Sequence, residues 1–462
     1  MRKQTLNRYF GDKAFYKMLM AIVVPMILQN GLTNLVSLLD NIMVGAVGTE
    51  QMSGVSIVNQ LLFVFNLCIF GGLSGAGIYT AQYYGKSDHQ GVQHTFRFKL
   101  MLVVALFAIG VGVFLGFGDK LISLYLHEGG ETGDIVATAG YGAGYLRVML
   151  WGLLPFALMQ AYAGTLRETG ETLLPMKAGI VAIVVNLVLN YILIFGHFGA
   201  PAMGVEGAAL ATVISRYVEC AIVIGWTHRH SDQALFIVGS YKSMRVPAQL
   251  VGAIFKRGMP LLVNEFLWSA GMAMLTQCYS TRGLAVVAAV NICSTIANLF
   301  NVVWLAMGTA VSIVVGQHLG AGDFDEAEAS CWRILTFSVL SAAGMGVVMA
   351  ALSGVFPAMY NTTQEVRSIA TGCLLMVALS GPLHAFNHAS YFTLRSGGKT
   401  WITFLFDSVF LWVIAIPVVR ILAVGTALPI IAVYGVGQFI EVIKCGVAYA
   451  LLKRKVWINR IV

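Results

Sequence analysis

The sequence predicts an all-α membrane protein with twelve transmembrane helices in two pseudo-symmetric six-helix bundles. Three observations predict this fold class. Of the 462 residues, 58% are hydrophobic and 11% are charged, whereas soluble globular chains have about 45–50% apolar and about 25% charged residues. Apolar stretches of helical length recur along the whole chain, and two polar motifs occur once in each half.

The composition excludes several classes of protein. The charge is too sparse for a soluble enzyme, and the 29 Lys and Arg form no dense basic patch, so we expect no nucleic-acid partner. The seven cysteines include no Cys-x-x-Cys pair, which predicts neither a disulfide framework nor a zinc site. The sequence also lacks a P-loop and a His-Glu-x-x-His motif. We therefore expect a protein that is not an enzyme, has no cofactor, and uses an H+ or Na+ gradient for any uphill transport.

Each predicted helix is an apolar stretch long enough to cross a bilayer. A hydrocarbon core of about 30 Å needs about 20 apolar residues in a helix. Twelve stretches meet this length, with approximate boundaries. They are residues 18–39, 53–79, 97–117, 136–163, 173–196, 202–227, 250–278, 286–314, 331–353, 365–393, 401–424 and 427–452.

The basic residues predict the orientation of the chain. Short loops rich in Lys and Arg stay in the cytoplasm. Five basic residues lie within residues 1–17 and four follow residue 452. Most of the others fall in loops on the same predicted side. We therefore predict a multi-pass protein of the plasma (inner) membrane with both termini in the cytoplasm.

Two polar motifs repeat between the halves of the chain. Both halves begin on the same side of the membrane because each has six helices, so the repeats are parallel. We predict an N-lobe at 1–227, a cytoplasmic linker at 228–249 and a C-lobe at 250–462. The first motif is Gln82-x-x-Gly85-x-x-Asp88 against Gln317-x-x-Gly320-x-x-Asp323, and the second is Thr165-Leu-Arg-x-x-Gly170-x-Thr172 against Thr393-Leu-Arg-x-x-Gly398-x-Thr400.

A first candidate site lies in the first half. Asp40 ends the apolar part of the first helix, where a carboxylate is either an interfacial cap or a site for a proton or cation. Asn186 and Asn190 are four residues apart and share one helix face. They form either a helix–helix hydrogen bond or, with the hydroxyl of Thr212, oxygen ligands for a small hard cation beside Asp40. Na+ at Asp40 is the only metal that the residues suggest.

A second candidate site lies in the second half. Glu265 is midway along the seventh helix, five residues after Pro260, where it either takes a proton or cation or makes a structural hydrogen bond. His384 and His388 are four apart on the tenth helix. They either titrate near Glu265 or are hydrogen-bonded between helices. A zinc site is not expected because further ligands are missing.

Other charged residues are predicted to be structural. Glu441 and Lys444 are three residues apart on the last helix, where opposite charges can pair. Asp407 is less than two turns into the eleventh helix, and we expect it at the cytoplasmic interface near Lys399 and Arg395.

These features resemble the multidrug and toxic compound extrusion (MATE) family, over nearly the whole length of the chain. The resemblance implies a V-shaped pair of lobes, alternating access, and export of amphipathic, often cationic compounds in exchange for protons or sodium ions. We expect a monomer whose partners are such small molecules and the lipid bilayer. The motifs are Val24-Pro-Met-Ile-Leu-Gln-Asn30, Asp40-Asn-Ile-Met-Val-Gly45, Ala81-Gln-Tyr-Tyr-Gly85, Gly207-Ala-Ala-Leu-Ala-Thr212 and the repeated Leu-Arg-x-x-Gly.

The resemblance also implies roles for individual residues. It places the family's N-lobe cation site on Asp40, Asn186, Asn190 and Thr212. Some members have a second carboxylate where Asn190 stands, so the site here has less negative charge.

In the C-lobe, Glu265 matches a carboxylate that is important in many members. Some members place an Asp at the position of His384, and this departure favours protonation over sodium binding. Pro25 and Pro260 are the expected conformational hinges of the first and seventh helices. The alternative is a flippase for lipid-linked saccharides or another lipid-like substrate, which would need more basic residues lining its cavity.

Overall fold

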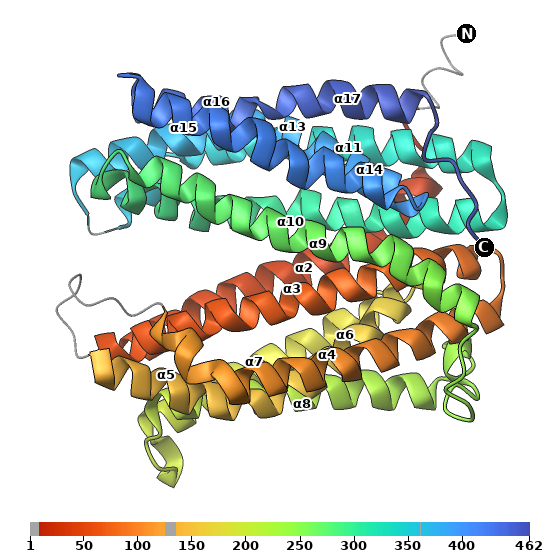
Figure 1. The fold of residues 1–462 in the computed structure, drawn as a ribbon, viewed down its shortest axis with the longest axis horizontal. Coiled ribbons are helices and arrows are strands. Elements are labelled where there is room, and N and C mark those ends of the chain that lie inside the picture. Colours follow the sequence, from red (N-terminus) through yellow and green to blue (C-terminus); the bar gives the residue numbers. More distant parts are fainter. Residues whose placement is uncertain (1–8, 125–134, 361) are drawn as a thin grey trace. The chain divides into compact units, whose positions relative to one another are not determined.

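The computed structural model describes residues 9–124, 135–360 and 362–462, and every regular element in these ranges is helical (Figure 1). Within them, eleven helical segments are long and apolar enough to cross a membrane. The remaining predicted span, in α9 (Ala248–Ser280), also forms a long helix, but Asn264 and Glu265 lower its mean hydropathy. Part of the basic N-terminal segment, residues 2–8, lies outside the described residues.

The helices of the first half follow the predicted spans. The span predicted at 136–163 contains a short 3-10 turn, η1 (Leu150–Gly152). Pro155 lacks an amide hydrogen and cannot donate to the carbonyl of residue 151, which interrupts the α-helical pattern there. The helices are α2 (Lys13–Gly45), α3 (Thr49–Gly85), α4 (His89–Ser123), α5 (Ile135–Met149), α6 (Leu153–Glu168), α7 (Leu173–Phe195) and α8 (Gly204–Arg229).

The helices of the second half include two π-helical turns. These turns, η4 (Leu405–Val409) and η5 (Leu411–Ala415), lie within the predicted span 401–424. A π turn has a wider hydrogen-bonding pattern than an α turn, and such turns often occur at functional sites. The helices after α9 are α10 (Leu284–Ala321), α11 (Phe324–Leu352), α12 (Val355–Ala358), α13 (Gln364–Ser396), α14 (Thr400–Phe404), α15 (Ile416–Gly425), α16 (Ile430–Phe439) and α17 (Glu441–Lys453).

Side chains and glycines at the helix ends explain several boundaries. α10 ends at Ala321 and is followed by Gly322, whose φ of 82° is left-handed and favours glycine. The next helix begins at once because the carboxylate of Asp323 accepts a hydrogen bond from the amide of Glu326 at 3.3 Å. The repeated Asp of the first motif therefore caps a helix in the second half.

The chain divides into two compact units. The N-unit comprises Leu28–Thr80 and His89–Ala253, and the C-unit comprises Met1–Ile27, Ala81–Asp88 and Ile254–Val462. α2 and α3 thus contribute residues to both units. The lobe boundaries predicted at 227 and 250 stay a prediction.

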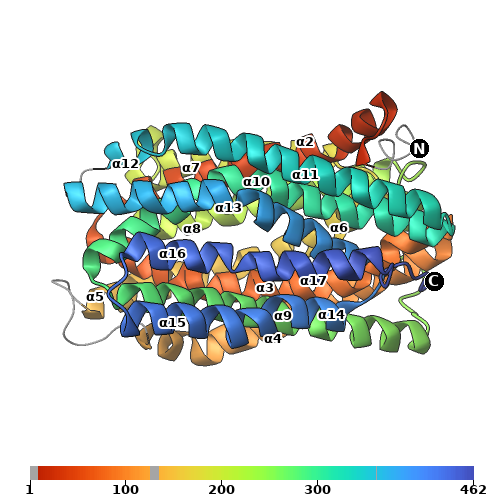
Figure 2. The ribbon, with the colours of Figure 1, turned by 90° about the horizontal axis from the view of Figure 1, so that it is seen from above.

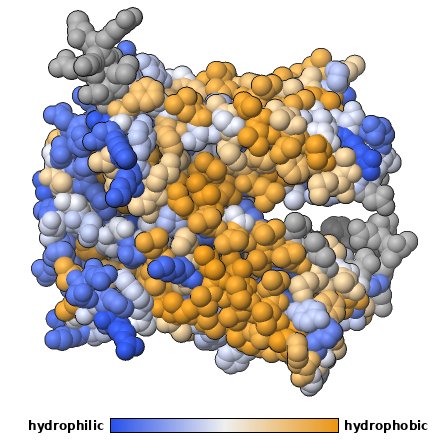
Figure 3. All heavy atoms as spheres, turned by 180° about the vertical axis from the view of Figure 1, so that it is seen from behind, coloured by the Kyte–Doolittle hydropathy of each residue, from blue (hydrophilic) through white to orange (hydrophobic). Residues whose placement is uncertain are grey.

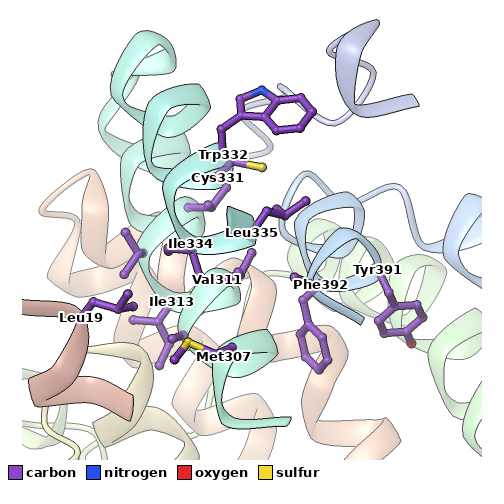
Figure 4. Close-up of a cluster of buried hydrophobic side chains, with 14 of the residues drawn as sticks. Leu19, Met307, Val311, Ile313, Cys331, Trp332, Ile334, Leu335, Tyr391 and Phe392 are labelled. Carbon is purple, nitrogen blue, oxygen red and sulfur yellow. The ribbon is translucent and has the colours of Figure 1, made fainter. Parts of the chain in front are cut away.

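The core of the C-unit is built from residues of several helices. Figure 4 shows Leu19, Met307, Val311, Leu335 and Phe392 among the buried apolar side chains of this cluster. Three helices that contribute to it, α10, α11 and α13, pack against one another (Figures 1 and 2). In the N-unit, α7 packs closely on α8.

The first repeated motif forms a reciprocal contact inside the C-unit. A Cβ on Gly85 would overlap the main-chain carbonyl of Gln317, and a Cβ on Gly320 would overlap that of Gln82. The two glycines therefore let the end of α3 and the end of α10 approach at backbone contact distance.

Gln82 also fastens the C-terminal segment of the chain. Its Nε2 donates to the carbonyl of Ser396 at 2.9 Å, and its Oε1 accepts from the amide of Ile461 at 2.9 Å. In the same segment Trp457 is 1% exposed. The segment after α17 is therefore part of the packed C-unit.

Apolar side chains cover much of the outer surface of both units. Figure 3 shows them over the middle of each unit, while hydrophilic side chains gather toward one end. Leu115, Val184, Val347 and Val413 are all more than half exposed. Lipid tails are as apolar as these side chains, so this surface is typical of a membrane protein.

Candidate cation and substrate sites

Four side chains predicted to form the first site lie in one hydrogen-bonded chain in the N-unit. Nδ2 of Asn190 donates to Oδ1 of Asp40 at 2.6 Å and to Oδ1 of Asn186 at 3.2 Å. Nδ2 of Asn186 then donates to the hydroxyl of Thr212 at 3.3 Å. The structure thus brings together all four residues, from α2, α7 and α8.

Helix geometry explains this arrangement. Asn186 and Asn190 are one turn apart on α7, so both face Asp40 and Thr212 on the neighbouring helices. Asn190 is 1% exposed and Asn186 is 6% exposed. Oδ1 of Asn190 is buried without a hydrogen-bond partner in the described structure. The site thus offers the unpaired oxygen of Asn190, a carboxylate, a second amide oxygen and a hydroxyl. Such oxygen atoms suit a proton or a small hard cation.

A tyrosine that the sequence analysis missed lies near this site. The hydroxyl of Tyr145 donates to Oδ1 of Asn59 at 3.3 Å, and the tyrosine is in electrostatic contact with Asp40 and Arg216. The guanidinium carbon of Arg216 lies 4.9 Å from the centre of the Phe156 ring. No motif marks Tyr145, because its role depends on helices that are distant in sequence.

Glu265, of the second predicted site, lies in the C-unit on α9. The side chain is half-buried, and its electrostatic neighbours are the guanidinium of Arg395 and the carboxylate of Asp407. Arg395 also hydrogen-bonds with Tyr391. The repeated Leu-Arg motif therefore places its arginine beside the intramembrane carboxylate of the C-unit.

The surroundings of Asp407 differ from the prediction. Oδ1 of Asp407 lies 3.3 Å from Nζ of Lys444, and Oδ2 accepts from Nδ2 of Asn264 at 3.1 Å. Neither of these two contacts involves Lys399 or Arg395, which the prediction placed near Asp407. The π-helical turn η4 contains Asp407, so a regular α-helical register does not describe the direction of its side chain.

The predicted pair on α17 is confirmed and extends into a network. Nζ of Lys444 lies 3.1 Å from Oε2 of Glu441. Nδ2 of Asn387 donates to the same carboxylate oxygen at 2.8 Å. Together with Asp407, these side chains link three helical segments of the C-unit.

The two predicted histidines contact other groups. Nε2 of His384 lies 2.9 Å from Oε1 of Gln438 on α16, which is a hydrogen bond between helices, and the described residues show no hydrogen bond between His384 and Glu265. The ring of His388 packs edge-on against Trp304, with 4.9 Å between centres. The described residues contain no group of three or more His, Cys, Asp or Glu side chains that could hold a metal ion.

The two predicted hinge prolines lie inside long helices. Pro25 is within α2 and Pro260 is within α9. Each removes one main-chain hydrogen bond and leaves a carbonyl one turn earlier without its usual donor. Their role as hinges stays a prediction.

The fold and these sites define a multi-pass helical membrane protein of the transporter class, with a half-buried carboxylate within a helix of each unit. The family model named MatE matches residues 25–192 and 260–421. The chain belongs to the MatE family.

Named relatives and solved structures agree with this assignment. The chain is 25% identical over 429 residues to "Probable multidrug resistance protein YoeA" of Bacillus subtilis, covering 89% of this chain and 88% of that protein. It is 24% identical over 409 residues to "Probable multidrug resistance protein NorM" of Thermotoga maritima, covering 87% and 84%.

A solved structure described as the outward-facing conformation of a MATE family transporter superposes with a TM-score of 0.84 at 19% identity, over 97% of this chain and 98% of that one. The predicted fold class is therefore confirmed.

Proposed function

We propose that this chain is a secondary active multidrug exporter that moves amphipathic, often cationic compounds by antiport with H+ or Na+. The observation that carries the proposal is the hydrogen-bonded chain from Asp40 through Asn190 and Asn186 to Thr212. A carboxylate among apolar helices is expensive in a membrane unless it has a partner or a function. The names of the relatives support the substrate class.

The proposed coupling acts through Asp40. Its carboxylate accepts a hydrogen bond from Asn190, which in turn is fixed by Asn186. A proton or Na+ at Asp40 competes with that hydrogen bond and changes the contact between α2 and α7. The ion drives transport if it binds one state of the protein more tightly than the other, because a ligand shifts an equilibrium only through differential affinity. Pro25 is the proposed hinge of α2.

Glu265 is proposed as a second titrating or substrate-contacting group. Its neighbours include Arg395, so a cationic substrate or a proton at Glu265 would change the balance of charge in the C-unit. His384, whose Nε2 lies 2.9 Å from Oε1 of Gln438, is proposed as a further titrating or substrate-contacting group of the C-unit. We also propose that the chain is a monomer in the plasma (inner) membrane with both termini in the cytoplasm, because the proposed groups lie within one chain and the short basic loops favour that side.

The test is efflux from proteoliposomes. Ethidium export is measured under an imposed proton gradient and, separately, a sodium gradient, for the wild type, Asp40→Asn and Glu265→Gln. We expect one gradient to drive export by the wild type and Asp40→Asn to abolish it, because asparagine cannot gain or lose a proton. The gradient that works identifies the coupling ion.

Asp119→Asn is the matched control, because Asp119 is an exposed carboxylate on α4. It should retain wild-type export. If neither gradient drives ethidium export by folded wild-type protein, the exporter proposal fails and the flippase alternative should be tested. That alternative needs basic residues lining its cavity, and the guanidinium of Arg216 lies instead 4.9 Å from the centre of the Phe156 ring.

A further inference from the structure

The ammonium group of Lys444 lies in a cage of two carboxylates and two aromatic rings. Nζ is 3.3 Å from Asp407 and 3.1 Å from Glu441. It also lies 5.2 Å from the centre of the Phe406 ring and 5.5 Å from that of Phe410. Lys444 is 8% exposed, while the side chains of Asp407 and Glu441 are 23% and 15% exposed.

The cage comes from two irregular stretches of helix. Phe406 and Asp407 lie in the π-helical turn η4, and Phe410 follows that turn directly. On the other side, α17 begins at Glu441, after the break at Ile440. The cage is therefore assembled only when these two segments pack together.

Amide groups hold both carboxylates in position. Asn264 donates to Oδ2 of Asp407 at 3.1 Å, which leaves Oδ1 toward the lysine. Asn387 donates to Oε2 of Glu441 at 2.8 Å. Asn264 is fixed in turn, because Ser408 donates to its Oδ1 at 2.7 Å. These contacts orient the acids independently of the lysine.

We propose that Asp407, Glu441, Phe406 and Phe410 form a binding site for an organic ammonium group, with the Lys444 ammonium as its resident occupant. Aromatic faces together with carboxylates recognise alkylammonium groups through cation–π and ionic attraction. A sodium ion instead prefers a shell of oxygen ligands, which the two rings do not supply. The C-unit therefore carries its own cation, and a competing group must be an amine.

This inference deepens the proposed function. It rests on that function only where it identifies the amines that compete with Lys444 during transport as the exporter's cationic substrates. The cage itself is defined by contacts alone and can be tested without transport.

The test uses chemical rescue of Lys444→Ala. The substitution removes Cγ, Cδ, Cε and Nζ, and these atoms together correspond to propylammonium. The melting temperature of the purified full-length protein is measured in detergent with increasing propylammonium chloride, 1-propanol or sodium chloride. The melting temperature is chosen over transport because an alkylamine would dissipate the pH gradient across a vesicle, whereas a measurement in detergent needs no gradient.

We expect Lys444→Ala to melt several degrees below the wild type, because two half-buried carboxylates lose their cation. Propylammonium should raise the melting temperature saturably toward the wild-type value, whereas 1-propanol and sodium should not. Lys453→Ala is the matched control, since Lys453 is exposed on the same helix, and it should not respond to the amine.

Three results would overturn the proposal. Equal rescue by sodium would mean that the carboxylates alone bind the cation. Equal rescue by 1-propanol would mean that only the volume is refilled. A folded Lys444→Ala protein that melts like the wild type and ignores the amine would mean that no site is present.

If Lys444→Ala does not fold, the double variant Lys444→Ala with Glu441→Gln replaces it, because it carries one negative charge fewer. Its melting temperature is then measured with the same increasing propylammonium concentrations. Rescue together with absent wild-type ethidium export would leave the ammonium site standing and reject only the exporter function.

Discussion

Asn190 has the most constrained side chain of the N-unit site. It donates to both Asp40 and Asn186, while its own Oδ1 is buried without a hydrogen-bond partner in the described structure. An unpaired buried acceptor is unfavourable. In the proposed site this oxygen is the second one, after the carboxylate of Asp40, that an incoming proton or cation can bind.

Replacing Asn190 with Asp should make the stability of the protein depend on sodium. The change removes a donor to Asp40 and places a second carboxylate at hydrogen-bonding distance, where two like charges repel unless a proton or cation lies between them. We expect a lower melting temperature in choline chloride than in sodium chloride for Asn190→Asp, and a much smaller difference for the wild type.

Asn190→Ala is the control for this prediction, because it removes the donor without adding charge. Its melting temperature should fall equally in both salts. An Asn190→Asp protein whose melting temperature ignores sodium from neutral to mildly alkaline pH would argue against a cation position between these side chains.

At the scale of helices, the repeated Gln-x-x-Gly motif is a packing device. The glycines of the two copies each lie against the main-chain carbonyl of the other copy's glutamine. A carbonyl of the main chain cannot rotate away as a side chain can. The motif recurs because each copy places its glycine against the glutamine carbonyl of the other copy, so both sides of the contact need the same residues.

Alanine at Gly85 or Gly320 should therefore destabilise the protein strongly. The added Cβ would force the ends of α3 and α10 apart and so disturb the hydrogen bonds that Gln82 makes with the C-terminal segment. Thermal unfolding in detergent measures the effect, and we expect overpacking to lower stability by about 1–3 kcal/mol.

Gly344→Ala is the matched control within the C-unit. Gly344 lies in α11, and a Cβ there would meet open space. Alanine is about 1 kcal/mol more favourable than glycine inside a helix, so this variant should be at least as stable as the wild type. Similar melting temperatures for all three alanine variants would refute the backbone-contact explanation.

At the scale of the whole molecule, basic residues should set the orientation in the membrane. Four of them follow residue 452, in the segment that Gln82 and Glu328 hold against the C-unit. A green fluorescent protein fused after Val462 should be fluorescent in a bacterial host, while alkaline phosphatase fused there should be inactive, because the proposed orientation keeps this end in the cytoplasm.

A fusion within the loop between α15 and α16, residues 426–429, is the comparison for this prediction. That loop lies one span before the C-terminus. Alkaline phosphatase fused to a chain that ends in this loop should therefore be active. Activity at Val462 and none at the loop would reverse the proposed orientation.

The helices and the N-unit site were predictable for local reasons. Apolar length alone indicates a membrane helix, and the four-residue spacing of Asn186 and Asn190 puts both on one face of α7 whatever lies around it. The ligand chemistry of a small cation and then the family resemblance grouped them with Asp40 and Thr212, and the structure shows these four in one hydrogen-bonded chain.

Contacts between distant helices required the tertiary structure. The spacing of Glu441 and Lys444 predicts their pair, but it does not reveal Asp407, which meets Lys444 only because the π-helical turn η4 packs beside α17. His384 likewise contacts Gln438 rather than Glu265. The rotation of a helix about its axis depends on its neighbours, and local periodicity carries no information about a neighbour that is distant in sequence.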